Sequence, residues 1–111
     1  MSELATVTAT DLEGARLVSV SGEIDLSNVD AVTAAISGSI PSDASLVIVD
    51  LSETAYLDSA GLAMLFRFAE RLGYSRQELR LVVPPDSPVR RVLELTNLDR
   101  VIRVEDAIST P

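Results

Sequence analysis

The sequence predicts a single α/β domain whose mixed, mostly parallel β-sheet is flanked by helices. Two observations support this prediction. Two segments of alternating apolar and polar residues open the chain, and helical and strand patterns alternate after them. Strands that alternate with helices pair in parallel through right-handed crossovers, and an opening hairpin adds one antiparallel strand. The expected order is β-β-α-β-α-β-α-β with a short C-terminal helix. A chain of 111 residues is expected to form one domain over residues 1–111.

The first two elements are predicted to form a β-hairpin. Residues 4–10, LATVTAT, and residues 16–22, RLVSVSG, alternate with the period of two that is typical of half-buried strands. Gly14 lies between them and supplies a turn signal.

A helix and a buried strand are expected next. Apolar residues recur at helical spacing across residues 29–36, with Ser27 or Asn28 as a candidate N-cap and Gly38 as a stop. Residues 46–51, LVIVDL, form a continuous apolar, β-branched run. Such a run is typical of a central parallel strand that is buried on both faces.

The second half of the chain repeats this alternation. Residues 52–58 are expected to be a connection, and SAGLAMLFRFAERLG is expected to be a helix that ends at Gly73. A strand over 79–84 and a turn over 85–88 precede an amphipathic helix. A short strand over 100–104 follows, and EDAI begins a last short helix.

Composition excludes several kinds of chemistry. The chain has no cysteine and no histidine, and every basic residue is arginine. Disulfides, thiolate or histidine metal sites, the Ser-His-Asp triad and the Ser-Lys dyad are therefore excluded. No motif for a cofactor or metal is present, so we expect neither. A net charge of −8 argues against a nucleic-acid partner. No membrane span or signal peptide is evident, which predicts a cytoplasmic protein.

The element Asp58-Ser59-Ala60-Gly61 at the start of the predicted second helix has three interpretations. In the first, Asp58 or Ser59 caps the helix, which is worth about 1 kcal/mol. In the second, Ser59 is a catalytic nucleophile, and the absence of a histidine or lysine base argues against this. In the third, Ser59 is a phosphorylation switch, because a helix N-terminus stabilises an added anion. Gly61 would leave the first turn open to the backbone of a partner.

A second candidate segment is SGEIDLSN, residues 21–28, where Glu23 and Asp25 precede the first predicted helix. These acids are either solvated residues of a capped helix start or an acidic surface near Ser59. Loops at the carboxyl ends of parallel strands share one edge of the sheet, so the two segments are expected to be neighbours. Asp50 is expected to hydrogen-bond the loop that follows it.

Three segments resemble the STAS family, and within it the stand-alone bacterial anti-sigma factor antagonists. They are VSVSGEIDLSN, LVIVDLSETAYLDSAGLAMLF and LRLVVPPDSPVRRVLELTNLDRVIRV, which cover nearly the whole chain in order. The D-S-x-G-L element is the most specific part, and G-E-I-D supports it. The resemblance implies a small mixed sheet flanked by helices and a non-enzymatic, partner-switching role.

In that family the unphosphorylated antagonist binds an anti-sigma factor that is also a serine kinase, and the sigma factor is released. The kinase phosphorylates the serine after the motif aspartate, which here is Ser59, and a PP2C-type phosphatase restores it. The resemblance implies a docking surface made by Glu23, Asp25, Ser27, Asn28, Asp58, Gly61 and Leu62.

Residue 60 is alanine where many relatives carry serine or threonine, so Ser59 is the only acceptor in the motif. The C-terminal helix is expected to be short, which argues against partner contact through it. An alternative is a STAS scaffold or interaction module in a stress-signalling or transport-associated complex, without a Ser59 switch. A small-ligand-binding role is a third option.

Overall fold

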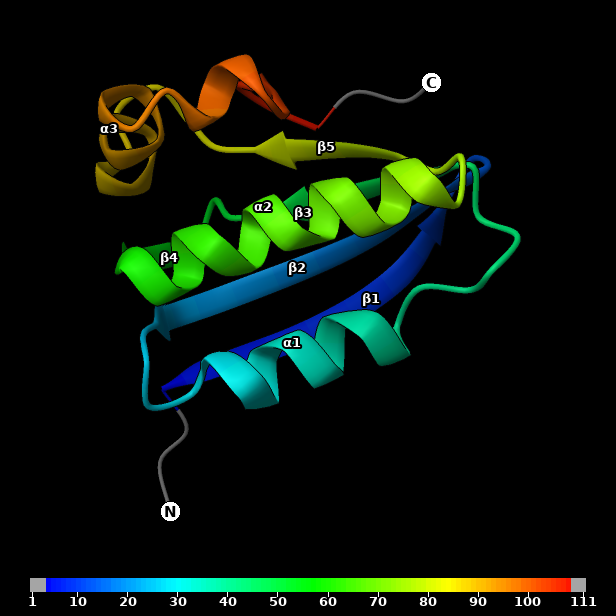
Figure 1. The fold of residues 1–111 in the computed structure, drawn as a ribbon, viewed down its shortest axis with the longest axis horizontal. Helices are drawn as coiled ribbons and strands as arrows, with labels where there is room; N and C mark the ends of the chain where they lie inside the picture. The colour runs from blue at the N-terminus through cyan, green and yellow to red at the C-terminus, as the bar shows by residue number, and fades with distance from the viewer. Residues whose placement is uncertain (1–3, 109–111) are drawn as a thin grey trace.

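The computed structural model describes residues 4–108, which fold into a mixed sheet covered by helices (Figure 1). In chain order the elements are β1 (Ala5–Leu12), β2 (Ala15–Ile24), α1 (Val29–Gly38), β3 (Leu46–Asp50), β4 (Thr54–Leu57), α2 (Ser59–Tyr74), β5 (Glu78–Val82), α3 (Pro88–Leu95), the 3-10 helix η1 (Leu98–Arg100) and β6 (Arg103–Glu105).

The sheet has the order β1-β2-β3-β5-β6, with β4 also paired to β2. Only the β1–β2 pair is antiparallel, which confirms the predicted hairpin and the mostly parallel sheet. Both residues of the hairpin turn have a positive φ, 42° at Glu13 and 87° at Gly14, and glycine adopts this conformation without steric cost. Strand β2 is longer than predicted and extends past Gly22 to Ile24.

The strand β4 is absent from the sequence prediction, which treated residues 52–58 as a connection. It continues the β3 side of β2, pairing Thr54 with Gly22 and Leu57 with Ile24. A register shift between Gly22 and Glu23 accompanies this pairing. Only the two end residues of β4 are buried, so the strand lacks the alternation that marks a half-buried strand in sequence.

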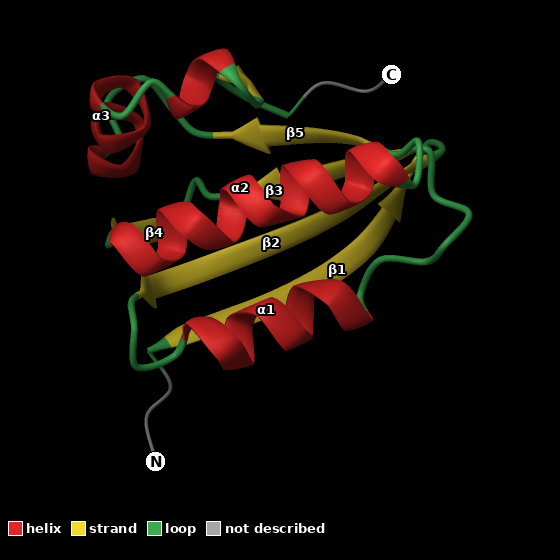
Figure 2. Cartoon of the chain, viewed as in Figure 1, coloured by secondary structure: helices red, strands yellow, loops and turns green. Residues whose placement is uncertain are grey.

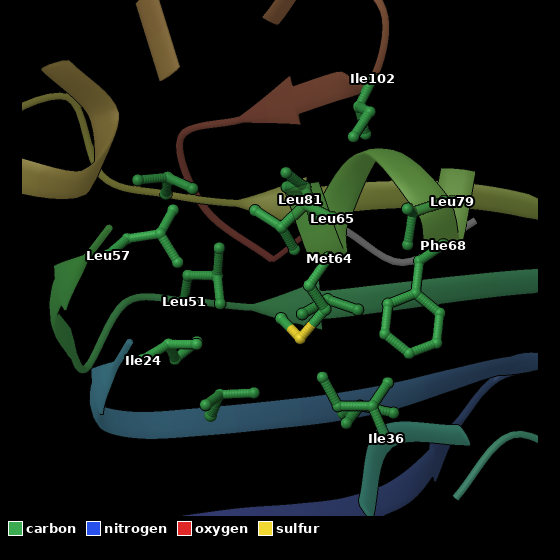
Figure 3. Packing of buried hydrophobic residues seen from close by; sticks show 14 of the residues in the cluster. Ile24, Ile36, Leu51, Leu57, Met64, Leu65, Phe68, Leu79, Leu81 and Ile102 are labelled. Atoms are coloured by element: carbon green, nitrogen blue, oxygen red, sulfur yellow. The ribbon is translucent and has the colours of Figure 1, made fainter. Parts of the chain in front are cut away.

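Helices α1 and α2 lie on one face of the sheet, where the main core forms (Figures 1 and 3). From the helices, Ile36, Met64 and Phe68 pack over the sheet residues Val18 and Val47. The apolar run of β3 is buried on both faces, as predicted, because a second cluster lies on the opposite face of the sheet. That cluster contains only strand residues: Ala15, Leu46, Ile48 and Val82.

Helix α2 ends later than predicted. Gly73 lies inside it, Ser75 is its C-cap, and Arg76 takes the left-handed conformation with φ of 58°. The Gln77 N–H donates to the Leu72 carbonyl at 2.8 Å, and the Arg76 N–H donates to the Gly73 carbonyl at 3.1 Å. These two bonds are those of a Schellman motif, in which arginine occupies the position that glycine usually holds.

The C-terminal elements also differ in part from the prediction. Helix α3 begins as expected, since Ser87 is its N-cap and accepts from the Val89 N–H at 3.1 Å. The predicted strand over 100–104 is instead β6, which starts at Arg103 after η1. The predicted last helix does not form over residues 105–108, and the rest of that segment, 109–111, lies outside the described residues.

Within residues 4–108, no helix combines the length and the apolar character needed to cross a bilayer.

Candidate functional site

The two candidate segments lie side by side at one edge of the sheet, as predicted. The Gly22 N–H donates to the Glu53 carbonyl at 3.0 Å, which joins the end of β2 to the loop before β4. The Asp58 N–H donates to the Ile24 carbonyl at 3.2 Å. Backbone contacts between two strand ends therefore bring residues 22–28 and 53–59 together.

Asp58 is the N-cap of α2, which decides between the two candidate caps. Its backbone is extended, and its Oδ1 accepts from the Gly61 N–H at 3.0 Å. Its Oδ2 accepts from the Leu26 N–H at 3.0 Å. One carboxylate thus satisfies an orphan N–H of the first helical turn and also fixes the loop that precedes α1.

Ser59 is the first residue of α2, and its side chain is exposed. Among residues 4–108, the side-chain hydrogen bonds at this helix start are made by the Asp58 carboxylate and none by the Ser59 hydroxyl. Capping is carried out by Asp58, so the Ser59 hydroxyl has no structural task in the helix start. It is a free oxygen at the positive end of a 16-residue helix.

The loop before α1 is closed by its own side chains. The Asp25 carboxylate accepts from the Ser27 N–H at 2.8 Å and from the Ser27 hydroxyl. Hydrogen bonding by the Ser27 side chain, and then by its backbone N–H, lowers the pKa of Asp25 below its ordinary value. Asp25 therefore holds its negative charge at the surface of a preformed loop.

Asn28 occupies the N-cap position of α1 but makes no side-chain cap bond to that helix. Its Oδ1 accepts from the Asp25 N–H at 2.9 Å, and its Nδ2 donates to the Glu23 carbonyl at 2.8 Å. The predicted cap is therefore right in position and wrong in partner, because the amide closes the loop instead. Glu23 itself is exposed.

Gly61 and Leu62 face the protein more than was predicted. Gly61 is buried, and a Cβ placed there would overlap the Leu57 side chain and crowd Ile24. The interpretation that Gly61 opens the helix to a partner is wrong, since its missing side chain makes room for Leu57. Leu62 is half-buried and packs against the core, and its N–H donates to the Asp58 carbonyl at 3.0 Å.

Two apolar side chains at this site were missed by sequence reasoning. Leu26 is 78% exposed and Tyr56 is 50% exposed. They line a surface hollow with Asp25, Ser27 and Asp58. For Leu26, a large apolar residue between the polar residues Asp25 and Ser27 was the available signal. Tyr56 stands between Ala55 and Leu57 in β4, so the sequence offers no such signal for it.

The chemistry available here is that of an exposed hydroxyl on an acidic surface with apolar contacts.

Asp50 serves the neighbouring loop, as predicted, by accepting from the Ser52 N–H at 3.0 Å. Within residues 4–108, no group of three or more potential metal ligands is present.

Comparison with known proteins places this geometry in context. The chain is 34% identical over 100 residues to the anti-sigma-F factor antagonist RsfB of Mycobacterium tuberculosis, covering 89% of this chain and 80% of that protein. An anti-sigma factor antagonist from Mycobacterium paratuberculosis has a similar structure, with a TM-score of 0.83 and 31% identity over 94% of this chain and 87% of the other.

The antagonist SpoIIAA in its unphosphorylated form shares the fold, with a TM-score of 0.69 and 20% identity over 89% of this chain and 87% of the other. The family model of the STAS domain matches residues 6–110. Because that match spans nearly the whole chain, the protein belongs to the STAS domain family.

Proposed function

We propose that this chain is an anti-sigma factor antagonist switched by phosphorylation of Ser59. The observation that carries the proposal is the free Ser59 hydroxyl beside Asp58, at the start of α2. In the unphosphorylated form the chain binds an anti-sigma factor with serine kinase activity, and the sigma factor is released. A PP2C-type phosphatase returns the phosphorylated form to the binding state.

The site explains how one phosphate would act. The N-terminus of α2 tolerates an anion, so the fold is expected to survive modification. A phosphoserine adds about −1.5 to −2 charge at neutral pH. That charge would stand beside Asp58 and on the same surface as Asp25, and a docked partner would be repelled without a large rearrangement.

The proposed docking surface combines polar and apolar contacts. Glu23, Asp25, Ser27 and Asn28 present a preformed acidic loop, and Asp58 fixes that loop to α2. Leu26 and Tyr56 add exposed apolar area, and tyrosine is one of the residue types enriched in the cores of protein interfaces. Leu62 supports the helix start, and Gly61 acts through packing only.

The names of the relatives support the partner. The Mycobacterium tuberculosis relative is an anti-sigma-F factor antagonist, and the chain aligns with 80% of it. From the proposed anti-sigma factor partner we infer a cytoplasmic location, because transcription takes place there. A binding role without catalysis agrees with a sequence that has no histidine or lysine to serve as the base for Ser59.

The test is capture of partners from a lysate of the source organism, with ADP added. Wild type, Ser59→Glu and Ser59→Ala are immobilised in parallel, and bound proteins are identified by mass spectrometry. Ser42→Glu, at an exposed position in the loop between α1 and β3, is the matched control for an added negative charge.

We expect wild type, Ser59→Ala and Ser42→Glu to retain a kinase-type anti-sigma factor that Ser59→Glu loses. With ATP, the captured kinase should add one phosphate to wild type and none to Ser59→Ala. Equal retention of the kinase by Ser59→Glu would refute exclusion by charge. Capture of other proteins by all forms, with no kinase, would favour the scaffold alternative.

A further inference from the structure

A groove runs between α1 and α2, away from the candidate site at their N-terminal ends. Met64 and Phe68 of α2 form its floor, and Thr33, Arg67 and Arg71 form its walls. Its volume is about 210 Å³. The floor residues belong to the main core, where they lie between α2 and Ile36 of α1 (Figure 3).

The two arginines of this groove have no carboxylate partner within residues 4–108. Among residues 4–108, ion pairs are formed by Arg16, Arg80, Arg90 and Arg103. Of the arginines without an ion pair there, Arg67 and Arg71 line a common groove. In a chain with 17 acidic and 9 basic residues, carboxylates are plentiful. Arg67 and Arg71 are four residues apart on one helix, so their guanidinium groups lie on the same face.

Arg71 is held in place before any partner arrives. Its Nη2 donates to the Ser37 hydroxyl of α1 at 2.8 Å, and its guanidinium carbon lies 5.2 Å from the centre of the Phe68 ring. A guanidinium carries five N–H donors in a planar fork that matches a carboxylate. The contact with Ser37 uses one of them, which leaves a preorganised cation on the groove wall.

The groove continues the proposed docking surface. Both helices start at the site edge of the sheet and run in the same direction (Figure 2). The surface over them is therefore acidic near Asp25 and Asp58 and basic near Arg67 and Arg71. Two opposite charges on one surface admit a partner of complementary polarity in one orientation.

The floor indicates what kind of group the groove receives. Met64 is 2% exposed and Phe68 is 4% exposed. A hydrophobic ligand would therefore bury little additional apolar area of these two side chains. Recognition would depend on the two cations instead. Bidentate hydrogen bonds between arginine and carboxylate are among the stronger polar contacts in proteins.

We propose that the α1–α2 groove is a second docking point, which receives an acidic segment of the protein partner through Arg67 and Arg71. The proposal rests on the proposed function for the identity of that partner. The carboxylates of the acidic segment hydrogen-bond to the two arginines. Another part of the same partner lies over the surface around Asp25 and Asp58. This contact sets the orientation in which the partner meets Ser59.

The first test uses a short fluorescein-labelled synthetic peptide of glutamate with interspersed leucine, in low-salt buffer. Fluorescence anisotropy measures its affinity for wild type, for the double variant Arg67→Glu/Arg71→Glu and for a control. The control is Arg91→Glu/Arg100→Glu, which makes the same change in net charge at two exposed arginines of α3 and η1. Neither of them forms an ion pair within residues 4–108.

We expect saturable binding to wild type, a loss of about tenfold or more in the groove variant, and little change in the control. Chemical-shift changes in wild type should centre on Thr33, Arg67 and Arg71. Because Arg71 contacts Phe68 and Ser37, Arg67→Gln/Arg71→Gln serves as a milder second variant, and thermal unfolding verifies that each variant folds. No saturable binding, or equal loss in the control, would overturn the proposal.

The same variants separate this proposal from the proposed function. If wild type captures the kinase-type anti-sigma factor and the groove variant captures it equally well, the groove proposal fails and the function stands. If the peptide binds the groove but no such kinase is captured, the groove remains an acidic-segment site and the assigned partner is wrong.

Discussion

Substitution of Asp58 should destabilise the protein far more than substitution of its neighbour Ser59. Asp58→Ala removes an N-cap bond to the Gly61 N–H, a second bond to the Leu26 N–H and a negative charge at the start of α2. The cap is worth about 1 kcal/mol, the second bond about 0.5–1.5 kcal/mol and the helix dipole about 0.3–1 kcal/mol.

We therefore expect Asp58→Ala to lower the free energy of unfolding by about 2–3 kcal/mol. For a domain of this size that corresponds to a fall in Tm of roughly 8–15 °C. Asp58→Asn keeps one acceptor oxygen and cannot serve both N–H groups, so it should lose about 1 kcal/mol. Ser59→Ala removes an exposed hydroxyl without a partner and should change stability by less than about 0.5 kcal/mol.

The assay is urea unfolding followed by circular dichroism, with Tm measured by calorimetry. The Leu26 and Gly61 amide resonances report whether the loop detaches from α2 in each variant. A loss in Ser59→Ala as large as that in Asp58→Ala would refute the reasoning, because Ser59 would then be part of the cap. Equal stability of Asp58→Ala and wild type would refute the double role of the carboxylate.

Three further predictions concern backbone conformation and pH. Because α2 continues through Gly73 to the C-cap Ser75, Gly73→Ala should stabilise the protein by about 0.5–1 kcal/mol and Arg76→Gly by about 1 kcal/mol in thermal unfolding. A helix that ended at Gly73 would reverse the sign of the first change. Gly22→Ala should destabilise by more than about 2 kcal/mol, since φ is 102° and a Cβ would overlap a backbone carbonyl. Unchanged urea unfolding would contradict this geometry. Ser27→Ala should raise the pKa of Asp25 toward its ordinary value in an NMR titration. The hydrogen bonds of the ionised Asp25 carboxylate stabilise the folded protein fully above the pKa that Asp25 has in the unfolded state, about 4. Wild type loses this contribution to stability as the pH falls through the lower pKa that Asp25 has in the folded state.

Much of the fold could be predicted because its signals are local. The hairpin alternates with period two, β3 is continuously apolar, and the Ser87-Pro88 pair marks the start of α3. Strand β4 could not be predicted in this way, because its pairing with β2 depends on the register shift at Gly22. The end of α2 was misplaced because Arg76 adopts a backbone conformation that its side chain does not favour.

The site was predicted in outline and corrected in its details. Loops that follow parallel strands meet at one edge of the sheet, so the neighbouring positions of Asp25 and Asp58 followed from topology alone. Which face Gly61 presents depends on how α2 rotates against Leu57, and that rotation is set by tertiary packing. The exposure of Leu26 depends likewise on the loop that Asp58 holds in place.

The connections at the two ends of the parallel strands differ in how well they tolerate inserted residues. Ala15, Leu46 and Glu78 lie in one row at the starts of three parallel strands, so the turn at Glu13 and Gly14 sits at the edge opposite Ser59. That turn is exposed, and lengthening a surface loop twofold costs only about 0.6 kcal/mol of closure entropy. One residue added between Gly22 and Ile24, by contrast, would turn Ile24 out of the core. A dye, tether or inserted domain therefore belongs in the hairpin turn, where it would leave the loop next to Ser59 at its native length.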